Sequence, residues 1–143
     1  MSNVNWFRDR FVQAGIIATR KLTVAPVIPD FTAAVEYGDA VQVVVQLKDA
    51  DGVAVARTVE CKCEILLLDG LLATSAEFTL SENGTGTEIS RTGKPTLIVS
   101  TSSTGACTIV VQDVPGSYVG DAYLVITPLN TFGSPGVLAI TFA

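Results

Sequence analysis

The sequence predicts an all-β fold, an antiparallel β-sandwich of about seven or eight short strands with an N-terminal arm. Residues 58–67 alternate strictly between apolar and mostly charged side chains, which is typical of a half-buried strand. Similar short apolar runs recur as far as residue 142, separated by clusters of glycine, proline, serine and asparagine. The body has almost no helical spacing, so stacked sheets are the expected architecture.

The arm and the body of the chain carry opposite charges. Residues 1–30 are predicted to form the arm and a proline-containing linker, and residues 31–143 the sandwich. Residues 1–22 carry four basic and one acidic side chain, a net charge of +3, whereas residues 23–143 carry five basic and 13 acidic side chains, a net charge of −8. We expect such an arm to dock on a neighbouring copy, because opposite potentials favour and orient association. Contact with another acidic partner, folding back on its own domain, or disorder are the alternatives.

Aromatic and arginine side chains gather near the beginning of the arm. Trp6 is the only tryptophan of the chain, and tryptophan and arginine are enriched among residues that carry interface energy. Apolar side chains here also have helical spacing, but Gly15 interrupts it, so we expect at most a marginal helix. Trp6 could equally cover the core of its own domain. The predicted interface residues of the arm are Trp6, Phe7, Arg8, Arg10 and Phe11.

The first elements of the body follow from prolines and alternation. Two prolines within residues 25–30 remove backbone donors, so this segment is interpreted as a linker or an edge segment. Residues 41–47 alternate as a strand does, and the turn-forming residues 49–52 then precede an apolar segment at 53–55, which predicts a hairpin. The turn begins like a calcium loop. However, valine and alanine stand where an EF-hand needs a ligand and a glycine, so a plain turn is expected.

An apolar run from residue 66 to residue 72 surrounds a turn at Asp69 and Gly70. Such a run belongs either to the core or to a contact surface. Leu71 and Leu72 are therefore interface candidates.

The second half of the body alternates repeatedly between apolar runs and turns. A glycine-rich loop at residues 81–87 has no lysine placed to bind phosphate. Phe132 lies in a turn-rich segment and is a further interface candidate. The expected strands cover residues 76–80, 95–100, 106–112, 122–127 and 137–142.

The three cysteines are interpreted as free thiols in the core. Cys61 and Cys63 share the apolar face of one strand, where an extended backbone holds them at about the upper limit for a disulfide. Cys107 could face them across the core, so a bridge from Cys107 to either stays open. The chain has no histidine, and a zinc site would need all three thiols and a carboxylate. We therefore predict no metal and no cofactor.

Three segments of the body carry a resemblance to a known family. Residues 47–55, 103–111 and 120–125 combine turns and strands in a pattern that resembles bacterial immunoglobulin-like modules of the invasin and intimin type. Modules of this kind also resemble those of tailed-phage virion structural proteins. The resemblance implies an immunoglobulin-like sandwich, with Tyr118 or Tyr123 at the position of a tyrosine corner. The chain lacks the paired cysteines and core tryptophan of antibody-type domains.

The resemblance implies a structural protein of a virion, either a capsid decoration or a head/tail accessory protein. Such a protein would be made in the host cytoplasm and would bind other virion proteins of the capsid or tail. No export signal is evident, no apolar stretch approaches membrane-spanning length, and the surplus of apolar residues suits a homo-oligomer.

Three other function classes fit the sequence less well. Catalysis is not expected, because the chain has no histidine and Glu60 and Glu64 lie on a solvated strand face without a partner nucleophile. The net charge of −5 of the whole chain disfavours nucleic-acid binding by the acidic body, although the arm alone could touch phosphates. A carbohydrate-binding or adhesive module is the main alternative, although few aromatic residues lie in candidate loops.

Overall fold

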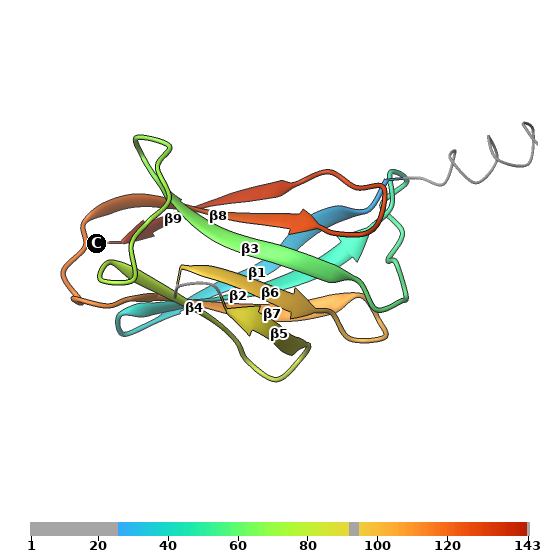
Figure 1. Ribbon diagram of the computed structural model, residues 1–143, viewed down its shortest axis with the longest axis horizontal. Coiled ribbons are helices and arrows are strands. Elements are labelled where there is room, and N and C mark those ends of the chain that lie inside the picture. The colour runs from blue at the N-terminus through green and yellow to red at the C-terminus, as the bar shows by residue number, and fades with distance from the viewer. Residues whose placement is uncertain (1–25, 92–94, 143) are drawn as a thin grey trace, which may run out of the picture.

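The computed structural model describes residues 26–91 and 95–142, and in these residues the protein is all-β, without helices. Nine strands form two antiparallel sheets packed face to face (Figure 1). The predicted antiparallel β-sandwich is confirmed, with one or two strands more than expected. The strands are β1 (Ile28–Tyr37), β2 (Ala40–Lys48), β3 (Glu60–Leu67), β4 (Phe78–Glu82), β5 (Thr87–Arg91), β6 (Thr96–Ser100), β7 (Ala106–Asp113), β8 (Gly120–Pro128) and β9 (Gly136–Phe142).

The order of the strands is that of an immunoglobulin-like sandwich. One sheet has the order β1-β2-β7-β4 and the other β5-β6-β3-β8-β9. These orders match the A-B-E-D and C″-C′-C-F-G sheets of a nine-stranded variable-type domain. The connection in the middle of the chain differs, because the strand in the D position (β4) precedes those in the C″ and C′ positions (β5 and β6).

The first strand occupies the segment interpreted as a linker or an edge. β1 begins at Ile28 and pairs with β2 along one side only, so the edge interpretation is confirmed. Val27, just before β1, is already buried in the core. Side chains from Thr32 to Glu36 are exposed on both faces of the strand, because β1 continues past the cover of the other sheet. The arm before residue 26 lies outside the described residues.

The alternation of the sequence places side chains in the core as predicted. Every second residue of β2 and β3 is buried, and the three cysteines lie among the buried residues without forming a disulfide. The two sheets therefore enclose a continuous apolar interior. Its largest fully buried side chains are Phe78, Leu47, Ile65, Leu80, Leu97, Ile109, Leu124, Ile126, Val43, Val45, Val99 and Val111.

The hairpin predicted at residues 41–55 is reduced to a turn. The amide of Val55 donates to the carbonyl of Leu47 at 2.9 Å, and Lys48 and Ala54 form one bridge, after which the chain crosses to the other sheet. Val53 is 60% exposed, so residues 53–55 offer too little buried surface for a second strand. The prediction was wrong there because a turn signal alone does not supply that cover.

The loops gather at two ends of the sandwich. One end holds the β1–β2, β3–β4 and β7–β8 connections and the end of β9, and Figure 1 shows it at the side marked C. The opposite end holds the β2–β3, β4–β5, β6–β7 and β8–β9 connections and the start of β1.

Candidate contact surface

The connections at the C-terminal end are joined by backbone hydrogen bonds. The amide of Asp113 donates to the carbonyl of Asp39 at 2.8 Å, and the amide of Val114 donates to the carbonyl of Glu77 at 3.0 Å. Three segments far apart in the sequence thus form one surface. We call residues 38–39, 68–77 and 113–121 the acidic end.

Carboxylates fix the β3–β4 connection within this surface. The amide of Leu71 donates to Oδ1 of Asp69 at 3.0 Å, and the amide of Gly70 closes the turn on the carbonyl of Leu67 at 2.8 Å. Further along, Oε2 of Glu77 accepts hydrogen bonds from the amide of Thr74 at 2.7 Å and from its hydroxyl at 3.0 Å. The loop is therefore held in one shape and presents its leucine side chains outward.

Tyr118 ties the β7–β8 connection to the sandwich. Its amide donates to Oδ2 of Asp113 at 2.8 Å, and its hydroxyl donates to the carbonyl of Asp121 at 3.1 Å. Its ring packs edge-on against Phe78 and Phe142, with centroid distances of 4.9 and 5.9 Å. Of the two candidates for the tyrosine corner, Tyr118 is the one that links this loop to β8.

Carboxylates lie around Tyr118 at this end. Burial raises the pKa of Tyr118, and the charges of Glu77, Asp121, Asp69 and Asp113 raise it further. The second oxygen of Asp113, Oδ1, is buried and accepts no hydrogen bond from the described residues.

The described cationic side chains lie toward the opposite end, although β5 ends toward the acidic end at Arg91. Of the side chains that the structure describes, the cationic ones are Lys48, Arg57 and Lys62, and all three lie toward the opposite end. That end also carries carboxylates, so it mixes both signs. Neither end of the body therefore carries charge of one sign only.

Large apolar side chains are exposed on the acidic end. Leu68 is 76% exposed and Val119 is 78% exposed, while Leu71, Leu72 and Val114 are exposed to a smaller extent. Leu71 and Leu72 thus belong to the surface and not to the core, which resolves the two roles left open for their segment. Sequence analysis missed Leu68 and Val119 as candidates, because nothing in their local pattern marks them as neighbours of one surface.

The arm joins the body at the opposite end. Val27 pairs in parallel with the β8–β9 connection, donating its amide to the carbonyl of Phe132 at 2.9 Å and accepting from the amide of Ser134 at 3.0 Å. The ring of Phe132 is 70% exposed, so this third body candidate also lies on the surface, but far from Leu71. The five candidates of the arm, from Trp6 to Phe11, lie outside the described residues.

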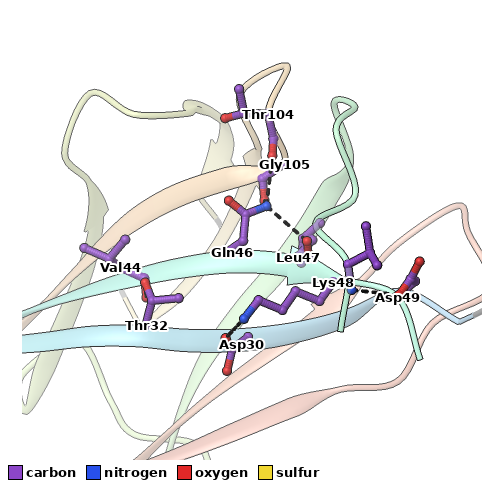
Figure 2. Close-up of polar contacts among 10 residues, drawn as sticks. Asp30, Thr32, Val44, Gln46, Leu47, Lys48, Asp49, Thr104 and Gly105 are labelled. Atoms are coloured by element: carbon purple, nitrogen blue, oxygen red, sulfur yellow. Dashed lines mark hydrogen bonds and ion pairs between the residues drawn. The ribbon is translucent and has the colours of Figure 1, made fainter. Parts of the chain in front are cut away.

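Polar contacts hold the start of β1 on its neighbour. Lys48 forms an ion pair with Asp30 at 2.5 Å, and the hydroxyl of Thr32 donates to the carbonyl of Val44 at 3.3 Å (Figure 2). On the other side of β2, Nε2 of Gln46 donates to the carbonyl of Thr104 at 2.9 Å. These contacts fix the direction in which the chain enters β1.

The thiols are positioned for packing and not for chemistry. Burial raises the pKa of Cys61 and of Cys107 to about 12, and burial also raises the pKa of Cys63. Electrostatic interaction with Cys107 and Cys61 raises the pKa of Cys63 further, and interaction with Cys61 does the same for Cys107, so the three buried thiols lie near one another in the core. Protonated thiols in an apolar interior are poor nucleophiles.

Two carboxylates of the opposite end anchor loops. Oδ1 of Asp49 accepts from the amides of Asp51 and Val53, both at 2.9 Å, which makes the calcium-like segment a plain turn. Glu82 holds the β4–β5 connection in the same way, with Oε2 accepting from the amide of Gly84 at 2.6 Å and Oε1 from that of Gly86 at 2.5 Å. These side chains stabilise turns through their charge.

Three kinds of site were not found in the described part of the chain. No group of side chains there could hold a metal ion, and no pocket opens between the described elements. A helix with the length and hydropathy to cross a bilayer is not found among these residues either.

Comparisons with known proteins add little to this picture. No protein-family model matches the chain, and no curated protein matches it. The sandwich is similar to part of a β-glucuronidase from Parabacteroides merdae, with a TM-score of 0.43, 16% identity, and coverage of 84% of this chain and 12% of that one. A structure of the enzyme with glycerol in its active site gives the same TM-score and identity and covers 85% of this chain and 12% of that one. This chain thus spans a small part of the enzyme's length, and so distant a likeness carries no argument about function.

Proposed function

We propose that this protein is a non-enzymatic structural module that works by contact between protein surfaces, as a homo-oligomer or on a larger shell. The observation that carries the proposal is the acidic end, where ordered loops hold exposed leucine and valine side chains beside carboxylates. Exposed apolar side chains on ordered loops are typical of protein interaction sites.

The described reactive groups have structural roles. The thiols are buried in the core, and Asp49, Glu77 and Glu82 each accept hydrogen bonds from backbone amides. A catalytic carboxylate or thiol needs a positioned partner and access to substrate. These arrangements support a module that binds without performing chemistry.

A virion is the setting that the resemblance to phage-borne immunoglobulin-like modules implies. The protein would then be a capsid decoration or a head/tail accessory protein, made in the host cytoplasm and bound to capsid or tail proteins. Its mechanism is clamping, in which the sandwich lies on the outside and the basic arm lies across a neighbour.

Removal of the arm tests this function. We expect the full chain to assemble in light-scattering measurements and a chain without residues 1–22 to remain a monomer. The full-length triple variant Trp6→Ala, Phe7→Ala, Phe11→Ala should assemble more weakly while its β-type circular dichroism is unchanged. Unchanged assembly of both variants would contradict arm-mediated contact.

Carbohydrate binding is the second candidate, and the exposed ring of Phe132 favours it. An aromatic ring in an exposed loop can stack on a sugar ring, and Phe132 lies in the β8–β9 connection, away from the acidic end. Binding on a glycan array that disappears in Phe132→Ala would support this candidate. The absence of binding to any glycan would leave the contact function as the better account.

A further inference from the structure

We propose that the acidic end receives the N-terminal arm of a second copy of this chain, so that copies assemble head to tail. This inference rests on the proposed contact function and names both the surface and its occupant. The surface consists of the loops around Leu68, Leu71 and Val119, and the occupant is the basic, aromatic segment Trp6–Phe11 of a neighbour.

The direction of the chain at Val27 favours a neighbour over the same molecule. β1 runs from the opposite end toward the acidic end, and its start is fixed by pairing with Phe132 and Ser134 and by the Asp30–Lys48 ion pair. At Pro26 and Val27 the chain therefore enters β1 from the opposite end. An arm that continues in that direction leads away from its own acidic end.

The length of the arm permits this contact. Fifteen residues separate Phe11 from Val27, and an extended chain of that length spans up to about 50 Å. The strands of the sandwich, at about 3.3 Å per residue, make a body roughly 30 Å long. The aromatic segment can thus reach a copy placed beyond the opposite end. It could also fold back along its own body, so length alone does not choose between the two.

Charge complementarity supports the same pairing. The arm carries Arg8, Arg10, Arg20 and Lys21 against one aspartate. The acidic end carries Asp39, Asp69, Glu77, Asp113 and Asp121, and β5 also ends on this side, at Arg91. Opposite fields orient the approach of the arm to this end.

Apolar complementarity supplies the second attraction. Leu68 and Val119 are mostly exposed on loops that backbone hydrogen bonds already order, so little further ordering of the surface is needed on binding. Trp6, Phe7 and Phe11 are aromatic side chains of the kind that anchor interfaces.

Head-to-tail contact has a consequence for assembly. The donating and receiving surfaces are different, so the interface is heterologous and generates rings or open chains of copies. A variant that lacks either surface still offers the other one.

The sole tryptophan permits a direct test in the full-length chain. Trp6 lies in the arm, so its fluorescence reports only on the arm. We expect its emission to shift to the blue as the protein concentration rises, in parallel with assembly measured by sedimentation velocity. The variant Leu68→Ser, Val119→Ser should remain a monomer with red-shifted emission, with association weakened about tenfold or more.

The matched control removes exposed apolar side chains from the flanks. Ile89 and Val137 lie on the edge strands β5 and β9 and are exposed. The variant Ile89→Ser, Val137→Ser should assemble as the unchanged chain does. Thermal unfolding of both double variants checks that each keeps the fold.

Mixing two defective full-length chains tests the head-to-tail arrangement itself. The triple alanine variant of Trp6, Phe7 and Phe11 has an inactive arm and an intact acidic end, and the Leu68→Ser, Val119→Ser variant has the reverse. Together they should form a dimer and nothing larger, and the emission of Trp6 should shift to the blue only in the mixture.

Three results would overturn the inference, and they differ in what else they overturn. Emission that is blue-shifted at every concentration in a monomer would place the arm on its own body. Assembly that survives Leu68→Ser, Val119→Ser but is lost in the triple alanine variant would refute the acidic end as receptor and leave the contact function intact. A chain that never assembles on its own, with Trp6 in solvent throughout, would refute the head-to-tail contact and homo-oligomeric assembly together.

Discussion

At the residue scale, side chains with reactive groups are used to hold the structure. Glu82 illustrates this, because its carboxylate accepts from the amides of Gly84, Gly86 and Thr108 and so joins the β4–β5 connection to β7. Cys107 does the same by packing, since it lies in the core opposite Cys61. The sequence predicted the burial of the thiols from alternation. It did not reveal the role of Glu82, because the amides that meet it come from separate segments.

Replacement of Glu82 should destabilise the protein. In Glu82→Gln the amide nitrogen of the new side chain would face the backbone N–H of Gly84 or Gly86, so a strong acceptor becomes a second donor. We expect the free energy of unfolding to fall by about 2 kcal/mol in chemical denaturation. Asp51→Asn, at an exposed turn position, is the control and should cost less than about 0.5 kcal/mol. Equal effects of the two changes would contradict the anchoring role.

Stability should decrease at alkaline pH because of the buried thiols. Burial raises the pKa of Cys61 and Cys107 from 9.0 to about 12, so the folded state keeps protons that the unfolded chain loses. The contribution of these thiols to the free energy of unfolding is unchanged below pH 9. It is lost as the pH rises from 9 toward 12, by up to about 1.4 kcal/mol per pH unit for each thiol. Denaturation curves measured from pH 8 to the alkaline limit check this, and Cys61→Ala, Cys107→Ala should flatten the dependence. Rapid reaction of the native protein with a thiol reagent at pH 8 would argue against buried, protonated thiols.

At the element scale, sequence alternation predicts the strands that bury one face and fails for those that bury none. β5 (Thr87–Arg91) was not predicted, because Thr87 to Ser90 are all exposed and no apolar period marks them. Backbone pairing places it beside β6. The opposite failure occurred at residues 53–55, where an apolar segment and a turn suggested a strand that the sandwich does not cover.

Two glycines in left-handed conformations should respond differently to alanine. Gly52 has φ +79 with open space around its Cα, whereas a Cβ on Gly105, with φ +76, would lie 2.0 Å from the carbonyl oxygen of Val55. Gly52→Ala should therefore lower the free energy of unfolding only by the conformational strain, about 1 kcal/mol. Gly105→Ala should cost about 3 kcal/mol or more, because backbone must move as well. Thermal or chemical denaturation measures both, and similar losses would mean that the β6–β7 turn yields easily.

At the scale of the whole molecule, the sandwich presents different surfaces at its two ends. The arm enters at the end that carries Phe132, and the acidic end, with Leu68 and Val119, lies at the other. Because the two ends differ, a head-to-tail contact joins one end of a copy to the other end of the next copy, whereas a symmetric contact would join two identical surfaces.

Assembly should weaken as salt is added. Attraction between the arm and the acidic end is screened when the Debye length shortens from about 10 Å at 0.1 M salt to about 3 Å at 1 M. We expect the association constant from sedimentation to fall steadily over this range. The variant Arg8→Gln, Arg10→Gln should associate more weakly and depend less on salt. Association that strengthens with salt would show that apolar contact dominates and that charge is not the guide.

The sequence by itself determined which side chains of β2 and β3 are buried. Their alternation between apolar and polar residues is a local pattern that can be seen without the structure. The sequence also determined the contrast in charge between arm and body, which is a matter of composition. Only the tertiary structure decided which residues share a surface. Asp39, Glu77 and Val114 are far apart along the chain and meet through backbone hydrogen bonds between three connections. Such long-range pairing depends on how the strands are ordered in the sheets, and no local pattern encodes that order.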